Sequence, residues 1–239
     1  MSTAVTEAVS VSDLVAAVRR QQAPRPAISP KAGTPPIRGA CVVGAHPGAG
    51  ATTVAVALAD ALDAIGRPGT LLDLAPSPDA FAAAECEVDS RVPGWRAGRR
   101  GQTQVLRRRT HEAEVRKFSS DLVVDGRMES LKSRVLVCRA TLPSVRRADA
   151  DLPDGAVLAV VGCSRWPKVV AASLGPNLQR AMDDGWIVFV PHDRDLELYG
   201  IDAEALPSSA RAAGRHVIEL LWPDLVGPSA PHRWKGHRR

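Results

Sequence analysis

The sequence predicts a three-layer α/β fold with a mainly parallel sheet, and three observations lead to this prediction. Short apolar runs alternate with longer helical patterns between residues 38 and 226, which is typical of parallel strands joined by crossover helices. The short runs are rich in valine and leucine and almost free of charge, as strands covered on both faces require. The chain has 239 residues, 45% of them hydrophobic, so it is long enough to bury the core of one such domain.

The two ends of the chain differ from this pattern. Residues 11–20 follow a short helical pattern, but five prolines between residues 23 and 36 remove amide donors and restrict the backbone. We therefore expect residues 1–37 to form a disordered, proline-rich arm with one short helix. Residues 227–239 combine prolines with positive charge and are too few to fold alone, so they predict a basic tail.

The elements of the domain follow in order along residues 38–226. Strands are expected at 40–43, 70–74, 122–125, 135–138, 157–161 and 187–190. Helices are expected at 52–65, 144–150, 169–183 and 209–221, with Gly66 and Gly185 as glycines that end two of them. Residues 85–117 are polar and rich in arginine, and they interrupt the alternation. They predict an insertion or a mobile loop.

A glycine-rich loop joins the first expected strand to the first expected helix. Gly44, Gly48 and Gly50 supply the turn, and the helix begins on two threonines. Glycines let successive backbone N–H groups point into one concavity, and the helix N-terminus adds partial positive charge. A hydroxyl in the first turn can then hold the magnesium of a nucleotide. The segment predicts a phosphate-binding loop, with these residues around the phosphates: Gly48, Ala49, Gly50, Ala51, Thr52 and Thr53. Close packing without a ligand is the alternative explanation of the glycines.

The loop His-Pro-Gly-Ala-Gly-Ala-Thr-Thr at 46–53 resembles the deviant Walker A loop K-G-G-x-G-K-T-T of the ParA/MinD family of P-loop ATPases. Weaker motifs follow in the order that the family has: LLDL at 71–74, DLVVD at 121–125, SVRRA at 144–148 and VPHD at 190–193. The resemblance implies a P-loop NTPase domain over residues 38–226, with ATP and magnesium as cofactors. It also implies that Asp73 orients the attacking water and that Thr52 and Asp125 hold the metal.

The departures from the family pattern are chemical. Ala51 replaces the lysine that binds the phosphates, and His46 replaces the lysine that reaches across a dimer. Ala75 replaces a second acidic residue, and Gly162-Cys163 stands where the family tends to carry an adenine-binding asparagine. One charge-assisted contact to phosphate contributes about 1.5 to 3 kcal/mol, so nucleotide binding should be weak and hydrolysis slow or absent. We also expect no nucleotide-driven dimer.

These features predict a cytoplasmic positioning, partitioning or assembly factor with a degenerate P-loop. The alternative is a nucleotide-free pseudo-ATPase scaffold in a mobile-element or secretion apparatus. No apolar stretch has the length of a membrane span, and four widely spaced cysteines form no metal or disulfide pattern, as in a cytoplasmic protein. Arginine far outnumbers lysine, which is typical of a GC-rich bacterial genome, such as an actinobacterial one.

A protein partner is expected, and DNA is the alternative. Clustered arginines neutralise phosphates, and Trp95 can stack on a base. Against DNA, Glu112 and Glu114 interrupt the run, and charge runs are usually solvated faces. The arginines that would contact DNA are Arg96, Arg99, Arg100, Arg107, Arg108 and Arg109.

Overall fold

The structure is a computed structural model, and it describes residues 38–75, 83–90, 93–110, 121–128 and 131–226. The chain divides into two compact units, Met1–Pro36 and Ile37–Arg239, and every described residue belongs to the second unit. The arm expected at 1–37 and the tail expected at 227–239 lie outside the described residues.

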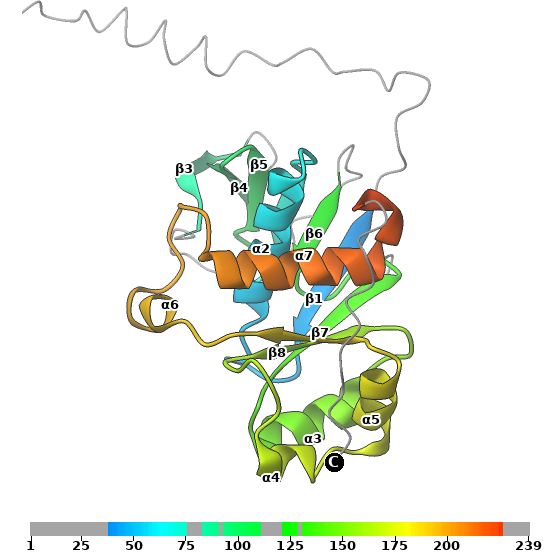
Figure 1. Cartoon of the computed structure of the whole chain (residues 1–239). Coiled ribbons are helices and arrows are strands. Elements are labelled where there is room, and N and C mark those ends of the chain that lie inside the picture. Colours follow the sequence, from blue (N-terminus) through cyan, green and yellow to red (C-terminus); the bar gives the residue numbers. More distant parts are fainter. Residues whose placement is uncertain (1–37, 76–82, 91–92, 111–120, 129–130, 227–239) are drawn as a thin grey trace, which may run out of the picture. The chain divides into compact units, whose positions relative to one another are not determined.

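A single sheet of nine strands runs through the described part of the chain (Figure 1). Its strands are β1 (Gly39–Gly44), β2 (Thr70–Asp73), β3 (Glu85–Asp89), β4 (Trp95–Arg100), β5 (Thr103–Arg108), β6 (Leu122–Asp125), β7 (Ser133–Arg139), β8 (Val157–Val161) and β9 (Ile187–Val190). The strand order is β3-β4-β5-β2-β6-β1-β7-β8-β9. In this spatial order, all neighbouring strands from β5 onward pair in parallel. Within the described sheet, only β3–β4 and β4–β5 are antiparallel.

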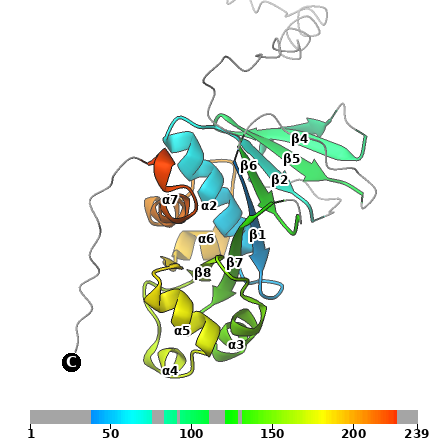
Figure 2. The same ribbon diagram turned by 90° about the vertical axis from the view of Figure 1, so that its right-hand side faces the viewer.

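Helices cover both faces of this sheet. They are α2 (Ala51–Ala64), α3 (Leu142–Asp151), α4 (Lys168–Ala171), α5 (Pro176–Asp183), α6 (Arg194–Tyr199) and α7 (Ser208–Leu221), followed by a 3-10 turn at Pro223–Leu225. Figure 2 shows α2 and α7 together on one side and α3, α4 and α5 grouped apart from them. The expected three-layer α/β fold with a mainly parallel sheet is therefore confirmed.

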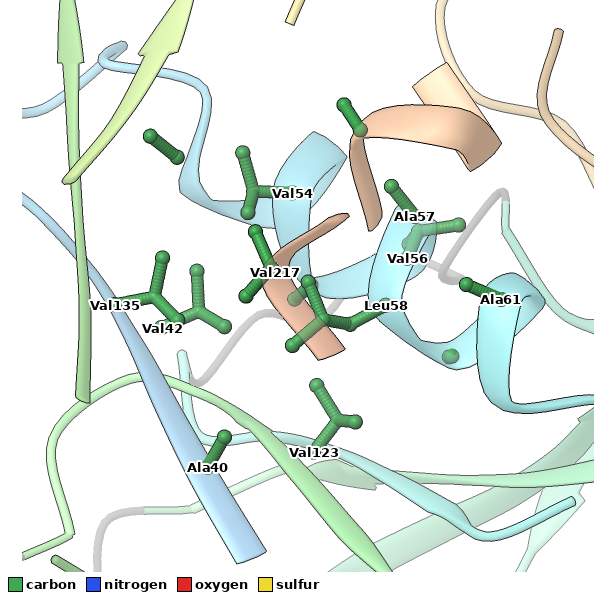
Figure 3. Close-up of a cluster of buried hydrophobic side chains, with 14 of the residues drawn as sticks. Ala40, Val42, Val54, Val56, Ala57, Leu58, Ala61, Val123, Val135 and Val217 are labelled. Carbon is green, nitrogen blue, oxygen red and sulfur yellow. The ribbon is translucent and has the colours of Figure 1, made fainter. Parts of the chain in front are cut away.

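The core follows from the alternation of side chains along the strands. Val135 and Val137 of β7 pack with α2 and α7, whereas Leu136 and Cys138 of the same strand pack with α3 and α5. Figure 3 shows the first cluster, in which valines of β1, β6 and β7 surround side chains of α2 and Val217 of α7. Successive apolar side chains of the central strands thus point to opposite faces of the sheet, and each face packs against its own layer of helices.

The six strands expected from the sequence are all present, each within two residues of its expected bounds. Gly66 and Gly185 have φ angles of 73° and 76°, in the left-handed region that glycine adopts without strain. Their expected positions at helix ends are confirmed. The described part of the chain contains no helix that is long and apolar enough to cross a membrane.

Two helix predictions need correction. The helix expected at 169–183 is two helices, α4 and α5, because Pro176 has no amide hydrogen and occupies the first turn of a new helix. No helix is predicted at 194–199, but α6 forms there, and it begins where the Asp193 carboxylate accepts hydrogen bonds from the amides of Asp195 and Leu196.

The arginine-rich segment at 85–117 has two predicted alternatives, an insertion or a mobile loop, and the structure contradicts the second. Its described part is not a mobile loop: it forms β3, β4 and β5, and β5 pairs in parallel with β2. Residues 111–117 lie outside the described residues. The segment therefore extends the sheet, and its side chains reach the carboxyl end of β2.

Candidate functional site

The glycine-rich loop joins the carboxyl end of β1 to the first turn of α2. The amide of Ala45 donates to the carbonyl of Val137 in β7 at 2.8 Å, and the amide of Ala49 donates to the carbonyl of His46 at 3.1 Å. Gly48 and Gly50 have φ angles of 77° and 98°, which side chains with a Cβ rarely adopt. The loop is thus a tight turn anchored to the sheet, and its backbone requires glycine at both positions.

The N-terminus of α2 has free donors. Its first internal hydrogen bond runs from the amide of Val54 to the carbonyl of Gly50 at 3.1 Å, and within the described ranges no side chain caps this helix. The amides of residues 51–53 therefore lack helical acceptors. With the helix dipole behind them, these amides are suited to an anion such as phosphate.

Thr52 and Asp125 meet at this helix end. The hydroxyl Oγ1 of Thr52 donates to Oδ2 of Asp125 at 2.6 Å, and Asp125 is the last residue of β6. Burial raises the pKa of Asp125 to about 6, and the nearby charge of Asp73 adds to this rise, whereas the hydrogen bond from Thr52 opposes it. The two groups expected to hold magnesium thus lie in direct contact.

Asp73 ends β2, where its Cα is the register partner of both Asp125 in β6 and Arg107 in β5. Its Oδ1 accepts from the amide of Ala75 at 2.9 Å, and its Oδ2 lies 3.3 Å from Nε of Arg107. Burial raises the pKa of Asp73, and the Ala75 amide and the Arg107 charge lower it. Asp73 and Arg107 are only 5% and 4% exposed, so they form a buried ion pair.

The charges continue along the sheet beyond this pair. Nη1 of Arg107 lies 3.9 Å from Oε1 of Glu87, whose Oε2 lies 3.4 Å from Nη1 of Arg96. Carboxylates and guanidinium groups therefore alternate from the end of β2 to β3 and β4. Arg107 balances the negative charge of Asp73 at the carboxyl edge of the sheet, and the sequence alone did not reveal this role.

His46 forms a hydrogen bond with Ser144, the first residue of the SVRRA motif. Its Nε2 lies 2.7 Å from Oγ of Ser144, and its Nδ1 lies 2.7 Å from the carbonyl oxygen of Pro47. A carbonyl only accepts, so Nδ1 carries a proton. The Ser144 hydroxyl accepts from the amide of Arg139 at 2.8 Å and has its own proton to donate to Nε2. This network engages both ring nitrogens of His46 with Pro47 and Ser144.

A cavity of about 440 Å³ lies at the carboxyl ends of β8 and β9. It is lined by residues 163–167 together with Pro191 and His192. Trp166 packs edge-on against Phe189, with ring centroids 5.5 Å apart. The position expected for an adenine-binding asparagine therefore borders an open space, on the same edge of the sheet as the glycine-rich loop.

Four of the six predicted DNA-binding arginines are paired with carboxylates. Arg100 is 2% exposed, and its Nε lies 2.6 Å from Oδ1 of Asp60. Arg107 is buried against Asp73, and Arg96 and Arg109 pair with Glu87 and Asp89. Trp95 is also buried, packed with Leu72 and Val124, so it cannot stack on a base. The DNA prediction is wrong for Arg100, Arg107 and Trp95.

The architecture matches solved structures of a bacterial cell division protein. A chain of the MinC:MinD cell division protein complex of Aquifex aeolicus aligns with a TM-score of 0.55 and 16% identity, over 81% of this chain and 98% of that one. The protein has the MinD fold. The MinD cell division protein of the same organism aligns with a TM-score of 0.49 and 15% identity, over 81% and 99% of the two chains. No family model and no curated protein matches the sequence.

The resemblance to ParA/MinD P-loop ATPases in the sequence is thus matched by the fold. In a MinD fold, the loop at 44–53 lies between a central strand and the helix that follows it, with Asp73 and Asp125 on adjacent strands. These elements follow one another in the order predicted from the sequence.

Proposed function

We propose that the protein binds a magnesium nucleotide, ATP foremost, weakly at the carboxyl edge of the sheet and hydrolyses it slowly or not at all. The observation that carries the proposal is the 2.6 Å hydrogen bond between Thr52 Oγ1 and Asp125 Oδ2 at the uncapped start of α2. A hydroxyl, a carboxylate and free amides of a helix N-terminus are together at one place. Residues Gly48 to Thr53 would surround the phosphates.

The residues present fit magnesium. Thr52 and Asp125 offer oxygen atoms, which this cation prefers. The described residues contain no group of three or more histidine, cysteine, aspartate or glutamate side chains suited to a metal. The metal would therefore need phosphate and water oxygens, as magnesium does when it binds with a nucleotide. Bound there, it would screen the charge of the phosphates.

The same site explains why turnover would be poor. Ala51 offers no charge to the phosphates, where a transition state develops negative charge. Asp73, expected to orient the attacking water, is already engaged by Arg107 and by the amide of Ala75. Binding without efficient hydrolysis is the consequence.

A nucleotide-free scaffold is the second candidate. It is favoured by the hydrogen bond from the amide of Ala49 to the carbonyl of His46, because that donor already has a partner inside the loop. In this case Gly48 and Gly50 serve the tight turn alone, and the Thr52–Asp125 bond only joins α2 to β6.

We propose that the protein works with a protein partner as a cytoplasmic positioning, partitioning or assembly factor. The structurally similar MinD is found in a complex with MinC, which supports a protein partner for a chain of this fold. Carboxylates neutralise Arg96, Arg100, Arg107 and Arg109, so we do not propose DNA as the partner.

Titration calorimetry with Mg-ATP tests the nucleotide proposal. A site with a Kd of about 1 μM that loses about 1.5 to 3 kcal/mol keeps a Kd of roughly 10 to 200 μM, which is the range expected here. Ala51→Lys should tighten binding by about one to two orders of magnitude, and Thr52→Val should weaken it. Absence of binding in both the native protein and Ala51→Lys would favour the scaffold.

A further inference from the structure

The glycine-rich loop lacks its own cation, but a cation from a neighbouring strand contacts it. Arg139 is the last residue of β7, and β7 lies beside β1 in the sheet (Figure 2). Its Nε donates to the carbonyl oxygen of Gly48 in the loop at 2.9 Å. The guanidinium group is therefore held against the loop that the proposed function assigns to phosphate.

The backbone of Arg139 is tied to the same loop by a second route. Its amide donates to Oγ of Ser144 at 2.8 Å, and this hydroxyl lies 2.7 Å from Nε2 of His46. The Cα of Arg139 is also in register with Val161 of β8, whose methyl groups approach Gly50. Arg139 thus contacts the loop directly through its side chain, and its main chain is linked to His46 of the loop through Ser144.

The guanidinium group has donors left for a ligand. Nε is used by Gly48, and the two terminal nitrogens make no hydrogen bond or ion pair with the residues that the structure describes. These nitrogens carry four N–H groups in a planar fork, which matches phosphate oxygens and stays charged at any working pH. Arg139 is exposed, so a solvated ligand can reach it.

We propose that Arg139 supplies the positive charge that Ala51 does not, and that it binds the phosphates of the nucleotide from β7. This inference rests on the proposed function of the same site. The contacts support it, because both ring nitrogens of His46 are engaged by Pro47 and Ser144, whereas the guanidinium group of Arg139 touches the loop and keeps its terminal nitrogens for a ligand. Arg139, which lies beside the loop, would thus bind the phosphates in place of a lysine inside the loop.

Calorimetry on the full chain with Mg-ATP, and with magnesium pyrophosphate as a base-free probe, tests the proposal. Arg139→Gln should raise the Kd of both ligands at least tenfold. Arg139→Lys should raise it less, because lysine keeps the positive charge. Arg146→Gln is the matched control: this arginine is exposed on the adjacent α3, and its loss should change Kd less than twofold.

The rescue experiment separates a phosphate contact from a role in loop structure. Ala51→Lys should tighten binding more in the Arg139→Gln background than in the native protein, because the new lysine then replaces the lost charge on the same phosphates. An equal gain in both backgrounds would assign Arg139 to loop structure and overturn the inference. If the native protein binds Mg-ATP and Arg139→Gln binds it equally well, the inference is wrong and the proposed function stands. If neither the native protein nor Ala51→Lys binds, both the inference and the proposed function fail.

Discussion

Replacing Asp125 by asparagine should stabilise the folded protein at neutral pH. This carboxyl is 8% exposed, and burial raises its pKa from 3.8 to about 6. A rise of about two pKa units corresponds to about 3 kcal/mol, because each unit is worth about 1.4 kcal/mol. Asparagine has no charge to bury and keeps an oxygen that can accept from Thr52. The expected gain in the free energy of unfolding at pH 8 is about 1 to 3 kcal/mol.

The pH dependence has a definite sign. Between pH 3.8 and about 6 the folded protein binds more protons at Asp125 than the unfolded chain does, so this group lowers stability as pH rises through that window. Above the window the cost is constant, and below it the cost is absent. The gain from Asp125→Asn should therefore be full at pH 8 and close to zero at pH 4.

A matched control lies just before the other end of the same strand. Asp121 is also buried, but its Oδ2 pairs with Nε of Arg67 at 2.8 Å and its Oδ1 accepts from the amide of Arg38 at 2.9 Å. Asp121→Asn removes a paired charge and should destabilise the protein by about 1 to 3 kcal/mol. Urea denaturation at pH 4, 6 and 8 measures both variants. A loss of stability for Asp125→Asn at pH 8, or an equal gain at pH 4 and pH 8, would refute the reasoning.

Three further predictions concern packing and assembly. Arg100→Ala breaks the buried ion pair with Asp60 and should lower the free energy of unfolding, measured in urea, by about 3 to 5 kcal/mol. Arg99 is exposed, so Arg99→Ala should change this free energy by less than about 0.5 kcal/mol. Equal losses for the two variants would contradict a stabilising role of the ion pair. Gly214→Ala should cost about 1 to 3 kcal/mol because an added Cβ overlaps a carbonyl of α2, while the exposed Ala212→Ser on the same helix is the control. Because His46 stands in place of a dimer-bridging lysine, the sedimentation coefficient should not change with Mg-ATP, and an ATP-dependent dimer would disprove this.

The central strands could be predicted because they are buried on both faces. β6 and β8 are short runs of valine, leucine and alanine that end at a single polar residue or a glycine. Runs of this composition and length favour strands that are buried on both faces of a sheet. The glycine-rich loop was equally visible, since the glycines at 48 and 50 are required by their φ angles. Features of this kind depend on residues that are close together in the sequence, so the sequence predicts them.

The charged strands could not be predicted in the same way. In β5, Thr103, Val105 and Arg107 alternate as buried residues with more exposed neighbours, but a pattern search counts arginine as polar. Arg107 is buried because Asp73, far away in the sequence, provides its counter-charge. The contact of Arg139 with Gly48 likewise joins residues that only the sheet brings together. Such pairs need the three-dimensional fold.

A crystal structure of the protein with magnesium and a non-hydrolysable ATP analogue tests the central claim most directly. Phosphates are expected against the amides at 51–53, and magnesium about 2.1 Å from Oγ1 of Thr52. Oxygens of Asp125 should face the metal or its waters. A structure grown at millimolar nucleotide in which the loop holds no phosphate and Thr52 still donates to Asp125 would contradict the account.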